Sequence, residues 1–211
     1  MNLWFATNNA HKKEELSACL RVNALTCDLP EITIKIPSQE GILFDPTETC
    51  GNFYENSLLK ARELFKILSE NKNTALYPII ADDSGLCVDA LGGRPGILSA
   101  RYGTKNGIKP GSNEQNMMLL DELADSKKRS ARFVCAMTVL YSYERFIVVQ
   151  ETIEGEIVEK NKIKGDRGFG YDPVFFIPQM GRTLAELTTE EKNKISHRGK
   201  AVKSIFKHIY A

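Results

Sequence analysis

Residues 79–103, IIADDSGLCVDALGGRPGILSARYG, decide how the rest of the chain is interpreted. The apolar run 78–81 comes first, and two acids, Asp82 and Asp83, follow it directly, before a serine and a glycine. This order is typical of a buried strand that ends at a functional edge of a sheet. Because neighbouring side chains on a strand face opposite ways, we expect only one of the two carboxylates to enter a given pocket, unless the chain kinks between them.

Two interpretations of this segment stay open. A carboxylate at the end of a strand, followed by glycines and arginines, suits a site where a hard cation meets an anionic ligand. However, Asp, Ser and Gly are also the commonest turn residues, so an ordinary polar turn explains the same letters. The residues concerned are Gly92, Gly93, Gly96, Arg94 and Arg101.

Length and charge bound the kind of protein this is. With 211 residues, 42% of them hydrophobic and 26% charged, the chain can form one large lobe or two small ones around a real core, and we expect a single domain over 1–211. Its 28 Lys and Arg balance 27 Asp and Glu, which gives a net charge of +1. No global field would therefore draw it to nucleic acid or to a membrane, and we expect neither as a partner.

We find no targeting signal in the sequence, and this, together with the spacing of its cysteines, predicts a cytoplasmic protein. The first apolar run is too short for a signal peptide, and no stretch of ~18 apolar residues occurs. The five cysteines, at 19, 27, 50, 87 and 135, include no close pair that would suggest a zinc site or a disulfide framework. We expect reduced and mostly buried thiols.

The N-terminal region has the layout of a phosphate cradle. An apolar strand over 3–6 is followed by a helix whose Leu16, Cys19 and Leu20 recur at helical spacing. Between them lies TNNAHK (7–12), in which Thr7 and Asn9 can donate to phosphate oxygens and Lys12 adds a positive charge. The alternative is that Asn8 or Asn9 simply caps the helix, and no P-loop sequence accompanies this stretch.

Two further charged residues stand near the middle of the chain. A helix is predicted over 52–68, with a buried stripe of Tyr54, Leu58, Ala61, Phe65 and Leu68. Lys60 is expected at the edge of that stripe, where its ammonium reaches either a ligand or solvent. Glu48, in the loop 45–51, is either a ligand or a solvated acid.

The remaining elements follow from capping and strand patterns. We expect one or two short strands over 26–36, a helix capped at 112–115, and a hairpin made by strands 133–141 and 146–149. A second capping box, Thr188 with Glu191, precedes Lys192, and SHR (196–198) precedes a last helix.

Glycines and aromatics alternate in GDRGFGYDPVFFIP (165–178). Such a loop can close its backbone on a planar ring that Phe169 or Tyr171 stacks against. The same aromatics could instead plug the edge of a sheet. His197 and Arg198, at a helix start, are either an ordinary helix boundary or two donors aimed at a ligand.

Several blocks together resemble the inosine triphosphate pyrophosphatase family, whose members clear non-standard purine nucleoside triphosphates. They are ATNNAHK, ENSLLKAR, ADDSGLCVDALGGRPGILSARYG, GFGYDPVFF and AELTTEEKNKISHRGKA, in that order and over about residues 3–206. The loop around Glu48 reads ETCGNFYEN and departs from the expected pattern at Cys50 and Gly51.

The resemblance implies a role for each candidate residue. Asp83 would be the general base and a Mg²⁺ ligand, Glu48 the other protein ligand, and Asp82 a possible assistant. The triphosphate cradle would comprise Thr7, Asn9, Lys12, Lys60, Ser84 and Lys192. The base pocket would comprise Phe169, Gly170, Tyr171, Asp172, His197 and Arg198.

The resemblance also implies a fold and a reaction. The fold would be an elongated, two-lobed α/β structure with a long mixed central sheet flanked by helices, an active site in the cleft between the lobes, and assembly as a homodimer. The reaction would be hydrolysis of ITP, dITP or XTP to the monophosphate and pyrophosphate. Alternatives are a related pyrophosphatase of different base preference and a non-catalytic nucleotide- or RNA-binding module.

Overall fold

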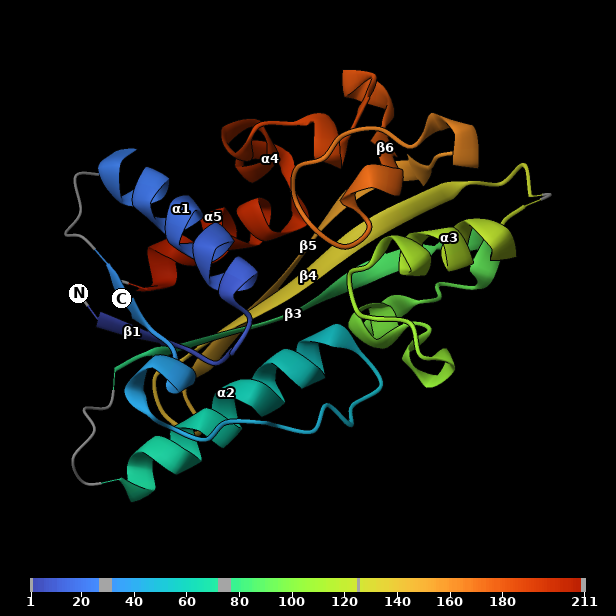
Figure 1. The fold of residues 1–211 in the computed structure, drawn as a ribbon. Coiled ribbons are helices and arrows are strands. Elements are labelled where there is room, and N and C mark those ends of the chain that lie inside the picture. Colours follow the sequence, from blue (N-terminus) through green and yellow to red (C-terminus); the bar gives the residue numbers. More distant parts are fainter. Residues whose placement is uncertain (1, 27–31, 72–76, 125, 210–211) are drawn as a thin grey trace. The chain divides into compact units, whose positions relative to one another are not determined.

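A computed structural model describes residues 2–26, 32–71, 77–124 and 126–209 (Figure 1). In this part of the chain seven strands form one sheet, in the order β2-β1-β3-β4-β5-β6-β7. β1 pairs in parallel with β2 and β3, whereas β6 pairs antiparallel with β5 and β7, so the sheet is mixed. The strands are β1 (Asn2–Phe5), β2 (Thr33–Lys35), β3 (Ile79–Val88), β4 (Ser130–Leu140), β5 (Phe146–Ile157), β6 (Phe175–Ile177) and β7 (Arg182–Thr183).

Helices flank this sheet, which confirms the predicted α/β class. They are α1 (Ala10–Thr26), α2 (Phe53–Glu70), α3 (Asn113–Glu122), α4 (Thr189–Ile195) and α5 (His197–Ile209). None of the described helices has both the length and the apolar character that crossing a membrane requires.

The chain divides into two compact units. The first comprises residues 1–83, 135–151 and 198–211, and the second comprises 84–134 and 152–197. Strands β3, β4 and β5 each contribute residues to both units. The single domain, the elongated shape and the cleft that the sequence predicts stay predictions.

In the first unit, β1 is buried on both faces. Leu3 and Phe5 pack with α1 and α5, while Trp4 and Ala6 pack with α2. This arrangement follows from the alternation of side chains along a strand, and it explains why the run is continuously apolar. Figure 1 shows α2 on the opposite side of the strands from α1 and α5.

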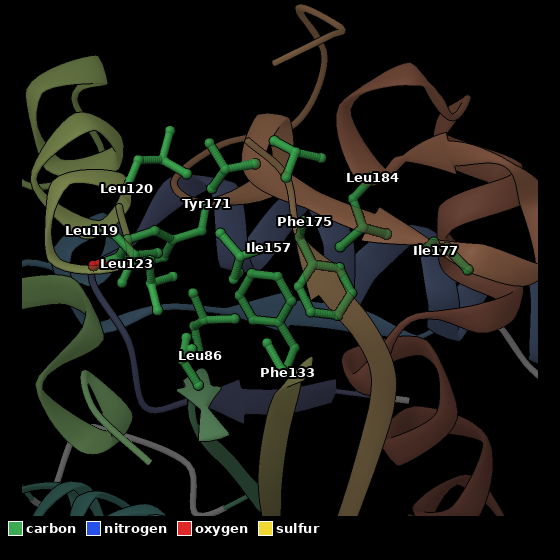
Figure 2. Close-up of a cluster of buried hydrophobic side chains, with 14 of the residues drawn as sticks. Leu86, Leu119, Leu120, Leu123, Phe133, Ile157, Tyr171, Phe175, Ile177 and Leu184 are labelled. Carbon is green, nitrogen blue, oxygen red and sulfur yellow. The ribbon is translucent and has the colours of Figure 1, made fainter. Parts of the chain in front are cut away.

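The second unit has its own core, shown in Figure 2. Leu86 of β3, Phe133 of β4 and Phe175 of β6 contribute to it, together with leucines of α3. The rings of Phe133 and Phe175 pack in a tilted arrangement with their centroids 4.8 Å apart. Tyr171 belongs to the same core, so the loop before β6 is attached to a rigid base.

Three boundaries differ from the sequence-based expectation. β3 does not end before Asp82, because it continues through both acids to Val88. Pairing within the sheet therefore overrides the turn preference of Asp, Ser and Gly. In the predicted region 26–36, Thr26 ends α1 and the one described strand is β2, while 27–31 lie outside the described residues. α5 already begins at His197, so His197 and Arg198 lie in its first turn.

The helix predicted over 52–68 is α2, but the face that it buries is not the stripe that the sequence predicts. Asn52 caps it by accepting a hydrogen bond from the Glu55 amide, 2.9 Å away. Tyr54, expected in the stripe, is exposed, whereas Lys60, expected at the edge, is buried. A lysine on the buried face needs oppositely charged partners, and these are part of the site described next.

The other predicted elements are confirmed. Ser112 caps α3 through the Gln115 amide, and Thr188 and Glu191 form the capping box of α4. β4 and β5 are neighbours in the sheet and are joined by a short turn, as the hairpin pattern predicts. The four described cysteines are free, and Cys19 and Cys135 are buried while Cys50 and Cys87 are only partly so.

Candidate functional site

Asp82 and Asp83 stand next to each other on β3 and bind different partners. Asp82 accepts from Lys12 of α1, whose Nζ lies 3.1 Å from its Oδ1, and from Arg198 of α5, whose Nη2 lies 3.1 Å from its Oδ2. Asp83 contacts Lys60 of α2, whose Nζ lies 3.4 Å from its Oδ1. The alternation of a strand thus sends the two carboxylates to opposite faces of the sheet, as the sequence predicts.

Asp82 is the centre of a buried ion-pair network. Burial would raise the pKa of its carboxyl group, but the positive charges of Lys12 and Arg198 outweigh burial and hold that pKa well below its usual range. Arg198 also pairs with Glu15, and these carboxylates raise the pKa of its guanidinium against the effect of burial. Asp82 is therefore ionised at any physiological pH.

Asp83 has the opposite electrostatic balance. Burial raises the pKa of its carboxyl group, and the nearby charges of Lys60 and Lys12 offset this only in part, so the net shift is upwards. A carboxylate whose pKa is raised towards neutral pH is a better acceptor for a proton taken from water. Of the two adjacent acids, Asp83 has the properties of a general base.

Lys60 joins Asp83 to Glu48. Its Nζ lies 2.8 Å from Glu48 Oε1 and 3.4 Å from Asp83 Oδ1, so one ammonium bridges two carboxylates. Burial lowers the pKa of Lys60, but Asp83, Asp82 and Glu48 together raise it above its usual value. Lys60 stays charged, which explains why a lysine is stable on the buried face of α2.

Asn56 is a residue of this site that the sequence interpretation missed. It is 0% exposed. Its Nδ2 donates to Asp83 Oδ2 over 3.1 Å, and its Oδ1 accepts from the amide of Cys50 over 3.0 Å. Asn56 therefore ties the loop that carries Glu48 to the candidate base. An amide that falls on the buried face of α2, one turn before Lys60, is the signal that could have revealed it.

The carboxylates of this site fit a divalent metal ion whose remaining coordination positions are filled by the substrate. No group of three or more His, Cys, Asp or Glu residues within the described ranges could enclose a metal ion by itself. Mg²⁺, however, is often bound through one or two carboxylates, with water and substrate phosphates filling the other positions. Glu48 and Asp83, which both contact the ammonium of Lys60 in this structure, offer two such carboxylate ligands.

The stretch before α1 caps the helix, which is the alternative that its sequence offered, and the phosphate cradle stays a prediction. Asn9 caps the helix, because its Oδ1 accepts from the Lys12 amide at 3.2 Å, and Thr7 Oγ1 accepts from the Asn9 amide at 3.1 Å. These bonds hold the first turn of α1 in a defined position, and the N-terminus of a helix is the kind of place that suits an anion. Lys12 reaches Asp82 and so belongs to the same network.

In the second unit, the loop 168–172 gathers around Asp172. Asp172 Oδ2 accepts from the Phe169 amide at 2.8 Å and from Lys192 Nζ at 2.8 Å, and this Nζ lies 5.0 Å from the centroid of the Phe169 ring. A side chain at Gly168 would place its Cβ 2.0 Å from Asp172 Oδ2, so only glycine allows this turn. Lys192, which the resemblance places in the triphosphate cradle, lies here with the loop.

Two other predicted base-pocket residues are packed into the second unit. Tyr171 is buried, and its hydroxyl donates to the Ser99 carbonyl at 3.0 Å, so this aromatic is part of the core of the second unit. The His197 ring stacks on Phe133, with centroids 4.9 Å apart and planes 10° from parallel. Phe169 is the aromatic of this loop that is not part of that core.

The candidate residues thus fall into two groups. Arg198, assigned to the base pocket by resemblance, lies with the acids. The first unit carries Thr7, Asn9, Lys12, Glu48, Lys60, Asp82, Asp83 and Arg198, and the second carries Ser84, Phe169, Gly170, Tyr171, Asp172, Lys192 and His197.

Comparison with known proteins gives consistent matches over almost the whole chain. The model of the Ham1 family matches residues 3–208. A dITP/XTP pyrophosphatase of Treponema denticola is 46% identical over 99% of this chain and 98% of its own length, and one of Clostridium perfringens is 40% identical over 95% and 93%. Among solved structures, a HAM1 protein from Coxiella burnetii superposes with a TM-score of 0.82, at 33% identity, covering 100% of this chain and 98% of that one. The Ham1 protein of Staphylococcus aureus gives a TM-score of 0.79 at 34% identity, with coverage of 100% and 98%.

Proposed function

Because this chain belongs to the Ham1 family, we propose that it hydrolyses non-standard purine nucleoside triphosphates, namely ITP, dITP and XTP, to the monophosphate and pyrophosphate. Relatives named dITP/XTP pyrophosphatase match it over nearly their full length. The observation that carries the chemistry is the arrangement around Asp83. There, a buried carboxylate with a raised pKa shares a lysine with a second carboxylate.

In this proposal, water attacks the α-phosphorus and Asp83 accepts its proton, so that pyrophosphate is the leaving group. Asn56 holds one of its oxygens by donating to Oδ2, which keeps the carboxylate in a fixed orientation. Glu48 and Asp83 would hold a magnesium ion, which when bound neutralises phosphate charge and lowers the pKa of a coordinated water. Lys60 places its charge between Glu48 and Asp83, and Lys12 places its charge beside Asp82. In this proposal both lysines stabilise the negative charge that develops on pyrophosphate as it leaves.

The residues of the second unit are proposed to recognise the base and adjoining groups. Phe169 offers a ring for stacking, and Lys192, which binds Asp172 beside that ring, is a donor of the kind that suits a carbonyl oxygen. Hypoxanthine and xanthine carry that oxygen at position six, where adenine has an amino group. In this structure Arg198 binds Asp82 and Glu15, so its contact with the base stays a prediction.

Other parts of the proposal rest on the sequence alone. Assembly as a homodimer and action in the cytoplasm stay predictions, and so does the absence of a nucleic-acid partner. The preference for magnesium over other divalent ions belongs to the proposal as well. It follows from the carboxylate ligands and the phosphate-bearing substrate.

A substrate panel tests this function. The purified protein is incubated with ITP, dITP, XTP, ATP, GTP and a pyrimidine triphosphate in the presence of Mg²⁺, and pyrophosphate and orthophosphate are measured separately. We expect pyrophosphate from the first three and strong discrimination against ATP, because a pocket built to hydrogen-bond one group rejects its replacement by up to ~10⁴-fold. Faster turnover of pyrimidine triphosphates would indicate a relative of different base preference, and binding without turnover would indicate a non-catalytic module.

A further inference from the structure

We propose that Asn116 on α3 is a positioning residue that holds the 168–172 loop in the shape required for base selection. This inference rests on the proposed function, because it assigns a selectivity role within the same reaction. Asn116 is not among the residues that the family resemblance pointed to. It is 4% exposed and lies on the face of α3 that packs into the second unit.

The contact that carries the proposal is a hydrogen bond across 54 residues of sequence. Asn116 Nδ2 donates to the carbonyl oxygen of Gly170 at 3.0 Å. Gly170 has a φ of +63°, in the left-handed region that favours glycine, so the loop turns sharply at this carbonyl. A donor fixed at that point sets the direction of the peptide between Phe169, which offers its ring, and Asp172, which binds Lys192.

The preceding residue, Gln115, binds the segment 99–111, which in turn contacts the 168–172 loop through Ser99. Its Nε2 donates to the carbonyls of Ser99 at 3.2 Å and Tyr102 at 2.9 Å, and its Oε1 accepts from the Gly111 amide at 2.9 Å. The Ser99 carbonyl also accepts from the Tyr171 hydroxyl. Two consecutive amides at the start of α3 therefore hold Gly170 directly and Tyr171 through Ser99.

The other polar atom of the Asn116 side chain, Oδ1, does not help the side chain to pack. Its Oδ1 is buried, and among the described residues no donor lies within hydrogen-bonding distance of it. A buried acceptor without a donor lowers stability. Leucine, which has nearly the shape of asparagine, would remove this unsatisfied atom. The benefit of asparagine at this position is therefore the bond to Gly170, and not the stability of α3.

The test compares Asn116→Leu with Leu119→Ala. Leu119 is fully buried in the core on the same helix, so its truncation weakens the fold without removing the donor to Gly170. Hydrogen exchange of the 168–172 amides and kcat and KM for dITP and ATP are measured for both variants and the wild type. Asn116→Ser, whose hydroxyl is too short to reach Gly170, serves as a second variant if leucine prevents folding.

We expect Asn116→Leu to melt within a few degrees of the wild type, because losing the buried unpaired Oδ1 offsets losing the bond to Gly170, while the amides of 168–172 exchange faster. Its KM for dITP rises more than its kcat falls, and the preference for dITP over ATP narrows by roughly three- to tenfold, as expected for one lost hydrogen bond. Leu119→Ala lowers the melting temperature and leaves this preference unchanged.

The proposal is overturned if loop exchange and preference in Asn116→Leu match the wild type, or if the preference narrows equally in Leu119→Ala. A wild-type protein that does not hydrolyse dITP would contradict the proposed function instead. In that case the exchange measurement alone decides whether Asn116 holds the loop, and unchanged exchange rejects the inference on its own.

Discussion

Asp82 and Asp83 are adjacent in the chain, but their carboxylates have different surroundings and different expected roles. Asp82 is held ionised by Lys12 and Arg198, while the pKa of Asp83 is raised by burial that Lys60 offsets only in part. The first arrangement is that of a structural ion pair, and the second is that of a proton acceptor. Substitutions at these two positions should therefore give different phenotypes.

Asp83→Asn should remove most turnover and leave the fold intact. The amide cannot accept a proton, and loss of a general base typically lowers kcat by about 10²- to 10⁴-fold. Stability should change little, because burial of the ionised Asp83 carboxyl group is already unfavourable. Steady-state kinetics and thermal melting of the variant check both points. A rate within a few-fold of the wild type would transfer the role of the base to another residue.

Asp82→Asn should mainly destabilise the protein. It leaves the buried guanidinium of Arg198 with less compensating charge, and removing one partner of a buried pair typically costs about 3–5 kcal/mol. Urea unfolding of the metal-free protein measures the loss. A free energy of unfolding equal to that of the wild type would show that Asp82 is not the charge that holds Arg198 and Lys12 in place.

The sequence identified many of these residues as candidates but could not assign their partners. Lys12, Lys60 and both acids stand in stretches that resemble a known family, so their presence in a site was predictable. The pairing of Asp82 with Arg198 spans 116 residues, and no local pattern encodes it. Asn56 and Asn116 were missed because a buried asparagine looks like any polar helix residue until its acceptors are placed by the fold.

At the scale of elements, β3 and α2 show where local patterns fail. The residues Asp82 to Gly85 have turn preferences, and yet they continue the strand because neighbouring strands pair with it. In α2, periodicity predicted the helix and its start to within one residue, but the buried face includes Lys60, which no hydrophobic pattern would place there. In both cases contacts with distant parts of the chain decided the outcome: neighbouring strands for β3, and the carboxylates that pair with Lys60 for α2.

The first turn of α4 gives a prediction for the pH dependence of stability. Hydrogen bonds from Arg182 and from the Thr188 backbone lower the pKa of Glu191 from 4.5 to about 2. Between these pH values the unfolded chain binds more protons than the folded one. The contribution of Glu191 to the free energy of unfolding is therefore present above pH 4.5 and is lost as the pH falls towards 2.

Glu191→Gln should therefore flatten the fall in melting temperature between pH 5 and pH 2. It should also lower the melting temperature at pH 7, because the charged partner of Arg182 and of the Thr188 amide is removed. Glu190→Gln, at the neighbouring acid in the same turn, is the matched control. If both variants follow the wild-type curve, the capping box does not contribute to acid stability.

At the scale of the molecule, hydrophobic clusters hold each compact unit together, and the proposed metal ligands Glu48 and Asp83 already pair with Lys60. Metal removal should consequently abolish turnover without unfolding the protein. We expect excess EDTA to reduce hydrolysis to background and to leave the melting temperature within about 2 °C of its starting value, with full recovery on adding Mg²⁺. A large fall in melting temperature would show that a metal supports the fold.

The family and the α/β fold were predictable because the matching blocks span the whole chain in order. The division into two units agrees with the two lobes that the resemblance implies, but its boundary was not predictable, because β3, β4 and β5 continue from one unit into the other and no change in composition marks it. A sequence shows such a division only when a linker separates the parts.

The central claim is that water attacks the α-phosphorus of a non-standard purine triphosphate. Turnover of dITP in oxygen-18 water, followed by mass spectrometry of both products, tests it most directly. The account predicts one labelled oxygen in the nucleoside monophosphate and none in pyrophosphate. Label in pyrophosphate, or labelled orthophosphate as the product, would contradict it.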